Sequence, residues 1–152
     1  MDNQTQQHAQ PDPFDLNRFV EAQAGVYEQA LAELKRSQKR SHWMWFIFPQ
    51  IDGLGRSSTA QFYAIKSPDE AKAYLNHPVL GPRLIECSRV LLQSQGFSAS
   101  DIFGFPDDLK LRSSMTLFAS VSEPDSVFVR VLGQYFEGQP DAQTLELLKQ
   151  QS

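Results

Sequence analysis

Cysteine is nearly absent from the sequence, which contains a single residue of this type, Cys87. One cysteine excludes an internal disulfide framework, and no cysteine and histidine pair has the spacing of a zinc site. We therefore expect a reducing compartment and predict neither a metal nor a cofactor. Because a reactive thiol needs an electropositive and partly exposed environment, we interpret Cys87 as a small buried hydrophobe on an apolar helix stripe.

Long apolar runs are absent as well. No stretch reaches the roughly 18–20 residues of a membrane span, and the N-terminal residues contain no apolar core of a signal peptide. These absences predict a cytoplasmic protein that does not bind membranes. Residues 1–13 are polar and rich in glutamine, so we expect a disordered tail there. Residues 14–152 then form one domain, since single domains cluster near roughly 100–150 residues.

Net positive charge is also lacking, because the chain carries a formal charge of −4. General nucleic-acid binding is therefore not expected, since such proteins present a clearly basic face. Common reaction motifs are missing too: the sequence has no HExxH, no GxSxG, no P-loop and no dinucleotide fingerprint. The sequence specifies no reaction, although five of its fourteen basic residues lie within 22 positions, at Lys35, Arg36, Lys39, Arg40 and Arg56.

Basic and aromatic residues are concentrated in one stretch, residues 35–63. Its centre, Trp43–Phe48, is a nearly continuous run of large apolar side chains, and periodicity alone does not distinguish a buried helix from a buried strand there. The aromatic content favours a strand, whereas Ser41 as a potential N-cap and Pro49 as a stop favour one or two helical turns. We predict the helix. Gly53 and Gly55 predict a tight connection after it.

Helical signals occupy most of the remaining chain. Apolar residues at three and four spacing predict one long helix from Asp15 to Leu34, with Asp15 as its cap. Ser67, Pro68 and Glu70 mark another helix start, and a helix apolar on most sides follows from about Asp107 to Val121. These patterns predict an all-α, compact single domain of about seven or eight helices. We expect the following side chains in one core: Trp45, Phe46, Phe48, Leu109, Met115 and Phe118.

Four blocks occur in order along the chain: KRSHWMWFIFPQIDGLGRS, YAI, HPVLGPRLIEC and IFGFPDDLKLRSSMTLFA. In these blocks the sequence resembles a bacterial family known as domain of unknown function eighteen-ten, over residues 14 to about 148. The resemblance implies a compact multihelical domain and no established activity. Some members carry a calpastatin-like label, but nothing in this chain resembles an inhibitor of a calcium protease.

Candidate site residues come from two segments rich in apolar side chains, residues 35–63 and the predicted helix from about Asp107 to Val121. We expect both segments at the centre of the fold. His42 is a candidate general acid or base, and Lys110 with Ser114 is a candidate lysine and serine pair on one helix face, so these three are the predicted catalytic residues. The predicted ligand-binding residues are Trp43, Arg56, Ser57, Tyr63, Arg112 and Ser113. Structural alternatives stand beside these assignments: a hydrogen bond at a helix start for His42, core packing for Trp43, an ordinary turn at Gly53–Ser58, and close helix packing for the serines. We expect His42, Arg56, Lys110 and Ser114 to converge on one cavity, because buried cations and hydroxyls need partners.

Two functional classes fit these residues. The first is a protein that binds or acts on a small anionic ligand, similar to a nucleotide or a sugar phosphate, with hydrolysis of an N-glycosidic bond as a candidate chemistry. The second is a non-enzymatic interaction module that uses the basic segment Lys35–Arg40 to contact an acidic partner. Composition leaves the oligomeric state open.

Overall fold

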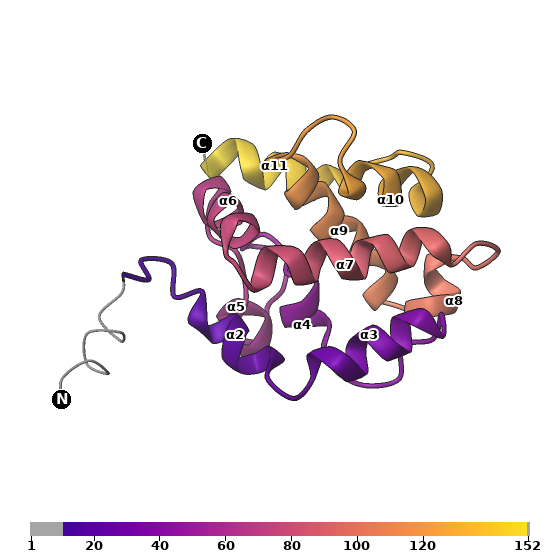
Figure 1. Cartoon of the computed structure of the whole chain (residues 1–152). Helices are drawn as coiled ribbons and strands as arrows, with labels where there is room; N and C mark the ends of the chain where they lie inside the picture. The colour runs from indigo at the N-terminus through magenta and orange to yellow at the C-terminus, as the bar shows by residue number, and fades with distance from the viewer. Residues whose placement is uncertain (1–10, 152) are drawn as a thin grey trace.

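The structure is a computed structural model that describes residues 11–151. These residues form ten helices (Figure 1), where the sequence predicted about seven or eight, and the all-α prediction is confirmed. Within the described range none of the helices is long and apolar enough to cross a membrane. The helices are α2 (Asn17–Gln23), α3 (Tyr27–Lys35), α4 (Met44–Ile47), α5 (Ser58–Phe62), α6 (Pro68–Asn76), α7 (Leu80–Gln93), α8 (Ala99–Phe103), α9 (Asp107–Ala119), α10 (Val127–Phe136) and α11 (Ala142–Gln151).

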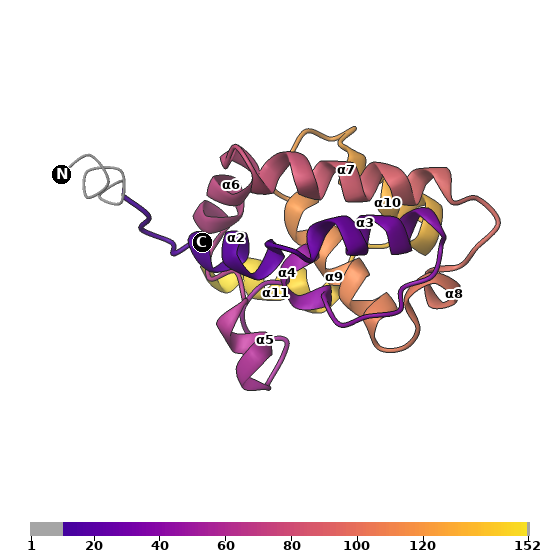
Figure 2. The ribbon, with the colours of Figure 1, turned by 60° about the horizontal axis from the view of Figure 1, so that its bottom comes forward.

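Helices α7 and α9 are the centre of the fold. Helix α7 packs against α3, α6 and α10, and α9 packs against α8, α10, α11 and α6. In Figure 1, α7 crosses the front of the molecule, with α10 and α11 above it and α3 below it. The short helices α4 and α5 lie near α2, and α5 projects from the body in Figure 2. Segments from both halves of the chain therefore meet around α9.

The predicted long helix from Asp15 to Leu34 is two helices, α2 and α3. The chain turns at Gly25, whose φ of +74° is accessible to glycine without strain. Asp15 does not cap α2, since its own φ is +52°. Asp12 takes that role, because its carboxylate accepts the backbone N–H groups of Leu16 (2.7 Å) and Asn17 (3.0 Å). The predicted tail otherwise lies outside the described residues.

The apolar run after Ser41 does form a short helix, α4, which ends before Pro49. The turn that follows is closed by an isolated parallel bridge between Ile51 and Ile65. The predicted start of α6 is confirmed as well, since the Ser67 hydroxyl accepts the backbone N–H of Glu70 at 3.1 Å with proline in the first turn. Such caps satisfy backbone donors that have no partner inside the helix.

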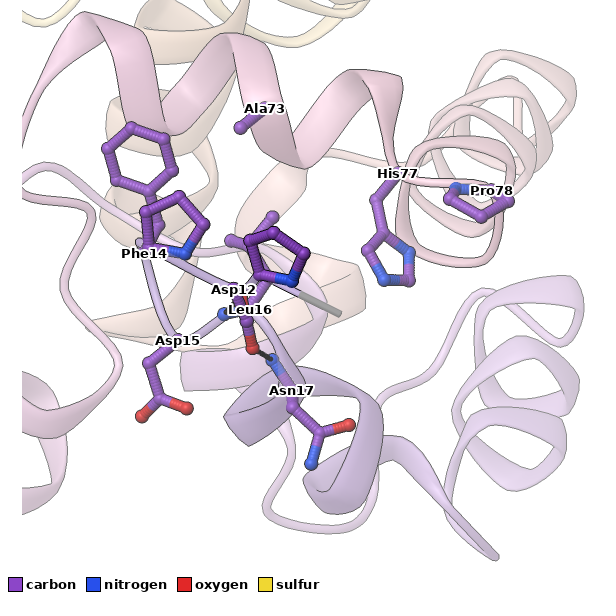
Figure 3. Close-up of a pocket in the computed structure, with 10 residues that line it drawn as sticks. Asp12, Phe14, Asp15, Leu16, Asn17, Ala73, His77 and Pro78 are labelled. Carbon is purple, nitrogen blue, oxygen red and sulfur yellow. Dashed lines mark hydrogen bonds between the residues drawn. The ribbon is translucent and has the colours of Figure 1, made fainter. Parts of the chain in front are cut away.

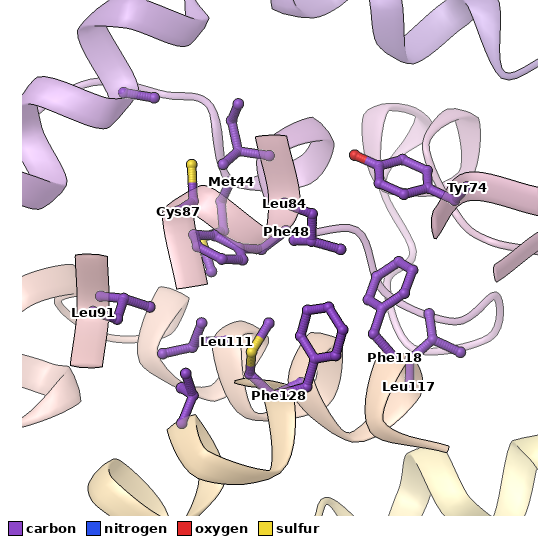
Figure 4. Packing of buried hydrophobic residues seen from close by; sticks show 14 of the residues in the cluster. Met44, Phe48, Tyr74, Leu84, Cys87, Leu91, Leu111, Leu117, Phe118 and Phe128 are labelled. Carbon is purple, nitrogen blue, oxygen red and sulfur yellow. The ribbon is translucent and has the colours of Figure 1, made fainter. Parts of the chain in front are cut away.

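The core lies between α7, α9 and the segments they cover (Figure 4). Phe48, Met115 and Phe118 are fully buried there, as predicted, while Phe46 packs on the edge. Cys87 is also fully buried, and burial raises its pKa to about 12, so the thiol is protonated at neutral pH. The predicted core position of Leu109 is wrong, because 48% of this residue is exposed on the outer face of the first turn of α9.

Candidate lysine and tryptophan site

The segment that leads into Trp43 is held by the buried carboxylate of Glu33. This carboxylate accepts the backbone N–H groups of Arg40 (2.8 Å) and Ser41 (3.1 Å). It also accepts the Ser41 hydroxyl (2.6 Å) and the indole N–H of Trp43 (2.9 Å). Burial raises the pKa of Glu33, but these hydrogen bonds favour the ionised form more strongly and hold the pKa at about 2. Glu33 is therefore an anion at neutral pH that fixes the position of Trp43.

Two lysines from distant parts of the chain meet at the carboxylate of Asp107. Lys39 Nζ lies 2.9 Å from one oxygen, and Lys110 Nζ lies 3.5 Å from the other. Each ammonium also lies 5.1 Å from the centre of an indole ring, Trp43 for Lys39 and Trp45 for Lys110, within the range of cation–π attraction. We call Lys39, Trp45, Asp107 and Lys110 the lysine–tryptophan site. Its charge is positive, because two ammonium groups share one carboxylate.

Three segments build this site. The first turn of α9 carries Asp107 and Lys110, three residues apart on one face. Lys39 precedes α4, and its backbone N–H is fixed by the carbonyl of Ile102 at 2.7 Å. Trp45, on α4, lies against Tyr63 and the glycine turn, where the remaining cavity measures only about 10 Å³. A ligand has no room on that side, so the accessible part of the site is the side of Lys110.

Several predicted site residues are enclosed and do not offer a surface to a ligand. Trp43 has no exposed surface, and its indole N–H is already bound to Glu33. The Ser113 hydroxyl donates to the carbonyl of Leu109 at 3.2 Å. Ser114 is fully buried, and its hydroxyl has no hydrogen-bond partner among the described residues. The structure therefore does not support contact of these three side chains with a ligand, because the helices around α9 cover them.

Three other predicted site residues, His42, Arg56 and Ser57, lie on the surface of the protein. His42 and Arg56 are exposed. The Ser57 hydroxyl caps the short helix α5, accepting the N–H three residues on at 3.1 Å. Gly53 has φ +108°, and a Cβ there would lie 3.1 Å from a methyl group of Leu147. The glycine turn thus serves packing against α11, and the structure gives no sign that it cradles a phosphate.

The two remaining predicted residues have structural partners. Tyr63 lies among aromatic rings, with Phe62 and Phe46 at 4.8 and 5.4 Å between ring centres. Arg112 donates from Nε to the carbonyl of Gln139 at 2.9 Å. The predicted convergence on one cavity is also not supported. Because Ser114 has no accessible surface, it cannot line an open cavity together with exposed His42 and Arg56.

A hollow of about 700 Å³ lies elsewhere, between the N-terminal segment and the turn from α6 to α7 (Figure 3). His77 lies at its edge, and its Nδ1 accepts the backbone N–H groups of Val79 (3.1 Å) and Leu80 (3.2 Å). His77 is therefore a helix-end residue that holds the turn from α6 to α7. None of the predicted catalytic or binding residues lines the hollow, whose walls are Pro11, Asp12, Pro13, Phe14, Asp15, Leu16, Asn17, Ala73, His77 and Pro78.

Lys110 is thus the one predicted residue in the lysine–tryptophan site, and sequence reasoning missed three members. From the sequence, Asp107 is predicted only as the approximate start of a helix. The sequence places Lys39 in the basic segment Lys35–Arg40, which is expected to contact an acidic partner, and predicts Trp45 in the core. A signal was present in the spacing, since Lys39 precedes Trp43 by four positions and Asp107 precedes Lys110 by three. That spacing does not show which segments face each other.

The fold and this site together define a compact all-helical domain in which cationic and aromatic residues from its two halves meet. The chain belongs to the family described as "Protein of unknown function (DUF1810)", whose model matches residues 13–148. The family resemblance inferred from the four sequence blocks is therefore confirmed. A search of curated proteins found no match.

A solved structure shares the fold. The crystal structure of the conserved hypothetical protein Rv1873 from Mycobacterium tuberculosis has a TM-score of 0.89 and 54% sequence identity. The match covers 91% of this chain and 99% of the other. Fold and family are thus shown, and neither description states a ligand or a reaction.

Proposed function

We propose that the chain binds a small anionic ligand, similar to a nucleotide or a sugar phosphate, at the outer side of the lysine–tryptophan site. The observation that supports this is the unequal attachment of the two lysines to Asp107. The Lys39 ammonium is closer, at 2.9 Å, and its side chain is only 8% exposed. The Lys110 ammonium is 3.5 Å away, and its side chain is 27% exposed. Lys110 is therefore the cation that can leave the carboxylate to contact an anion.

The neighbouring indole favours a ligand that has a planar ring as well as a negative group. Trp45 is half-buried, and the Lys110 ammonium now covers one face of its ring at 5.1 Å. When Lys110 moves to a phosphate, this face becomes free to stack on a base or a sugar. A nucleotide would use both groups, whereas ribose 5-phosphate would use Lys110 with less help from the ring.

Calorimetric titration with AMP, ADP-ribose and ribose 5-phosphate tests this proposal. Lys110→Ala should weaken binding of all three by about tenfold or more, since a charge-assisted contact contributes roughly 1.5–3 kcal/mol. Trp45→Leu should weaken nucleotides more than ribose 5-phosphate. Lys72→Ala, which removes an exposed lysine of α6, is the matched control and should bind normally. Equal affinity of the Lys110 variant and the wild type would refute the site.

For a nucleotide-like ligand we propose N-glycosidic hydrolysis as the chemistry. Exposed His42, three positions before Trp45, and Lys110 are the groups that such a ligand would contact. Chromatography would follow release of the free base, which should fall in His42→Ala and stay normal in His77→Ala. Binding of these ligands without any release of base would make the protein a binder and remove the hydrolase proposal.

The interaction-module alternative also has a structural basis. Of the basic segment Lys35–Arg40, Lys39 is engaged inside the molecule, whereas Lys35, Arg36 and Arg40 remain exposed near the end of α3. An acidic partner protein would contact these three cations. Charge reversal at Arg36 should then abolish the complex and leave nucleotide titrations unchanged, which separates this alternative from the first proposal.

A further inference from the structure

We infer that the first two turns of α9, with the turn that precedes them, form a twofold interface with a second copy of the chain. The segment exposes two large apolar side chains: 79% of Phe105 and 48% of Leu109 are accessible to solvent. Phe105 lies in the turn between α8 and α9, which protrudes from the body in Figure 2. Neither side chain is buried in the core. Their contact with water is unfavourable in free energy, and burial against a partner surface would remove this unfavourable contact.

The charges beside Leu109 indicate which partner fits. Asp108 and Arg112 are four residues apart on α9, so the two opposite charges occupy one face beside the exposed leucine. When two copies of such a helix pack antiparallel about a twofold axis, the same flank meets itself in reverse order. Asp108 of each copy then lies opposite Arg112 of the other, Leu109 meets Leu109 of the other copy near the axis, and Phe105 lies at the edge of the contact. The surface is therefore complementary to itself.

Both charged groups are oriented and still have capacity for a partner. One Asp108 oxygen accepts the N–H of Leu109 at 2.9 Å, which leaves the second oxygen for another donor. Arg112 is fixed through Nε to the carbonyl of Gln139 and through its stacking 5.8 Å from the centre of the Phe136 ring. Its terminal amino groups suit a two-point contact with a carboxylate. Lys110, on the other side of Leu109, contacts Asp107 within its own chain.

Sedimentation equilibrium of the full chain from about 5 to 500 µM tests the interface. The mass-average molecular weight of the wild type should rise from 17.2 kDa toward twice that value. Leu109→Glu should remain monomeric with an unchanged helical spectrum. Phe62→Ser is the matched control: Phe62 is 54% exposed on α5, away from α9, and this variant should dimerise like the wild type.

A charge exchange makes the test specific to the proposed geometry. Arg112→Asp should weaken dimerisation by about tenfold, because two symmetric contacts become repulsive. The double variant Asp108→Arg, Arg112→Asp should regain dimerisation to within about threefold of the wild type, because the opposite charges meet again. A wild type that stays monomeric at every concentration overturns the inference. Dimerisation that persists in Leu109→Glu, or a double variant no better than the single one, overturns it as well.

Discussion

Replacement of Glu33 by glutamine should destabilise the protein strongly, although it changes only one side-chain atom. The pKa of Glu33 falls from its ordinary value of 4.5 to about 2 in the folded chain. At about 1.4 kcal/mol per pKa unit, the ionised form contributes about 3–4 kcal/mol. The residue is 3% exposed, so solvent screens this contribution little. Glu33→Gln also places an amide N–H₂ against donors such as the Trp43 indole N–H. We therefore expect the free energy of unfolding to fall by about 2–4 kcal/mol.

The pH dependence gives the sharper test. Because folding lowers this pKa, the stabilisation is complete above the unfolded value of about 4.5 and disappears as the pH falls toward 2. Urea denaturation followed by circular dichroism should therefore show a constant difference between wild type and Glu33→Gln near neutral pH, and a shrinking one below about pH 4.5. Glu146→Gln, at an exposed position of α11, should match the wild type. A loss below about 1 kcal/mol, or one independent of pH, would refute the role of Glu33.

Two paired substitutions test the packing around α7, α9 and α10. Ser114→Ala should be neutral or slightly stabilising, since its buried hydroxyl has no partner, whereas Thr116→Val should cost about 1–3 kcal/mol because Thr116 both donates and accepts a hydrogen bond. Gly81→Ala should lower the free energy of unfolding by about 2 kcal/mol or more, since its Cβ would lie 2.0 Å from the Leu75 carbonyl oxygen. Gly133→Ala has free space around the new Cβ within helix α10 and should raise the free energy of unfolding by about 0.5–1 kcal/mol. Chemical denaturation measures all four, and a large loss in Ser114→Ala or none in Gly81→Ala would contradict these assignments.

Local sequence signals sufficed where neighbours along the chain determine the structure. The start of α6 is an example, because Ser67, Pro68 and Glu70 interact within one turn. Helix α4 is another, because Pro49 ends the helix regardless of what packs around it. The break at Gly25 was harder to predict, since the apolar spacing continues through it and only the packing of α2 and α3 in different directions requires a turn there.

The sequence by itself determined the helical class, the starts of α6 and α9 and the end of α4 before Pro49, because capping and helix-breaking residues act over a few positions. Tertiary structure alone decided which tryptophan is enclosed: Trp43 donates to Glu33 inside the protein, and Trp45 lies under Lys110 at its edge. It also decided that Leu109 faces outward and that Lys39 and Lys110 share Asp107. The physical reason is that such contacts depend on how distant helices pack against each other, and local spacing does not specify that arrangement.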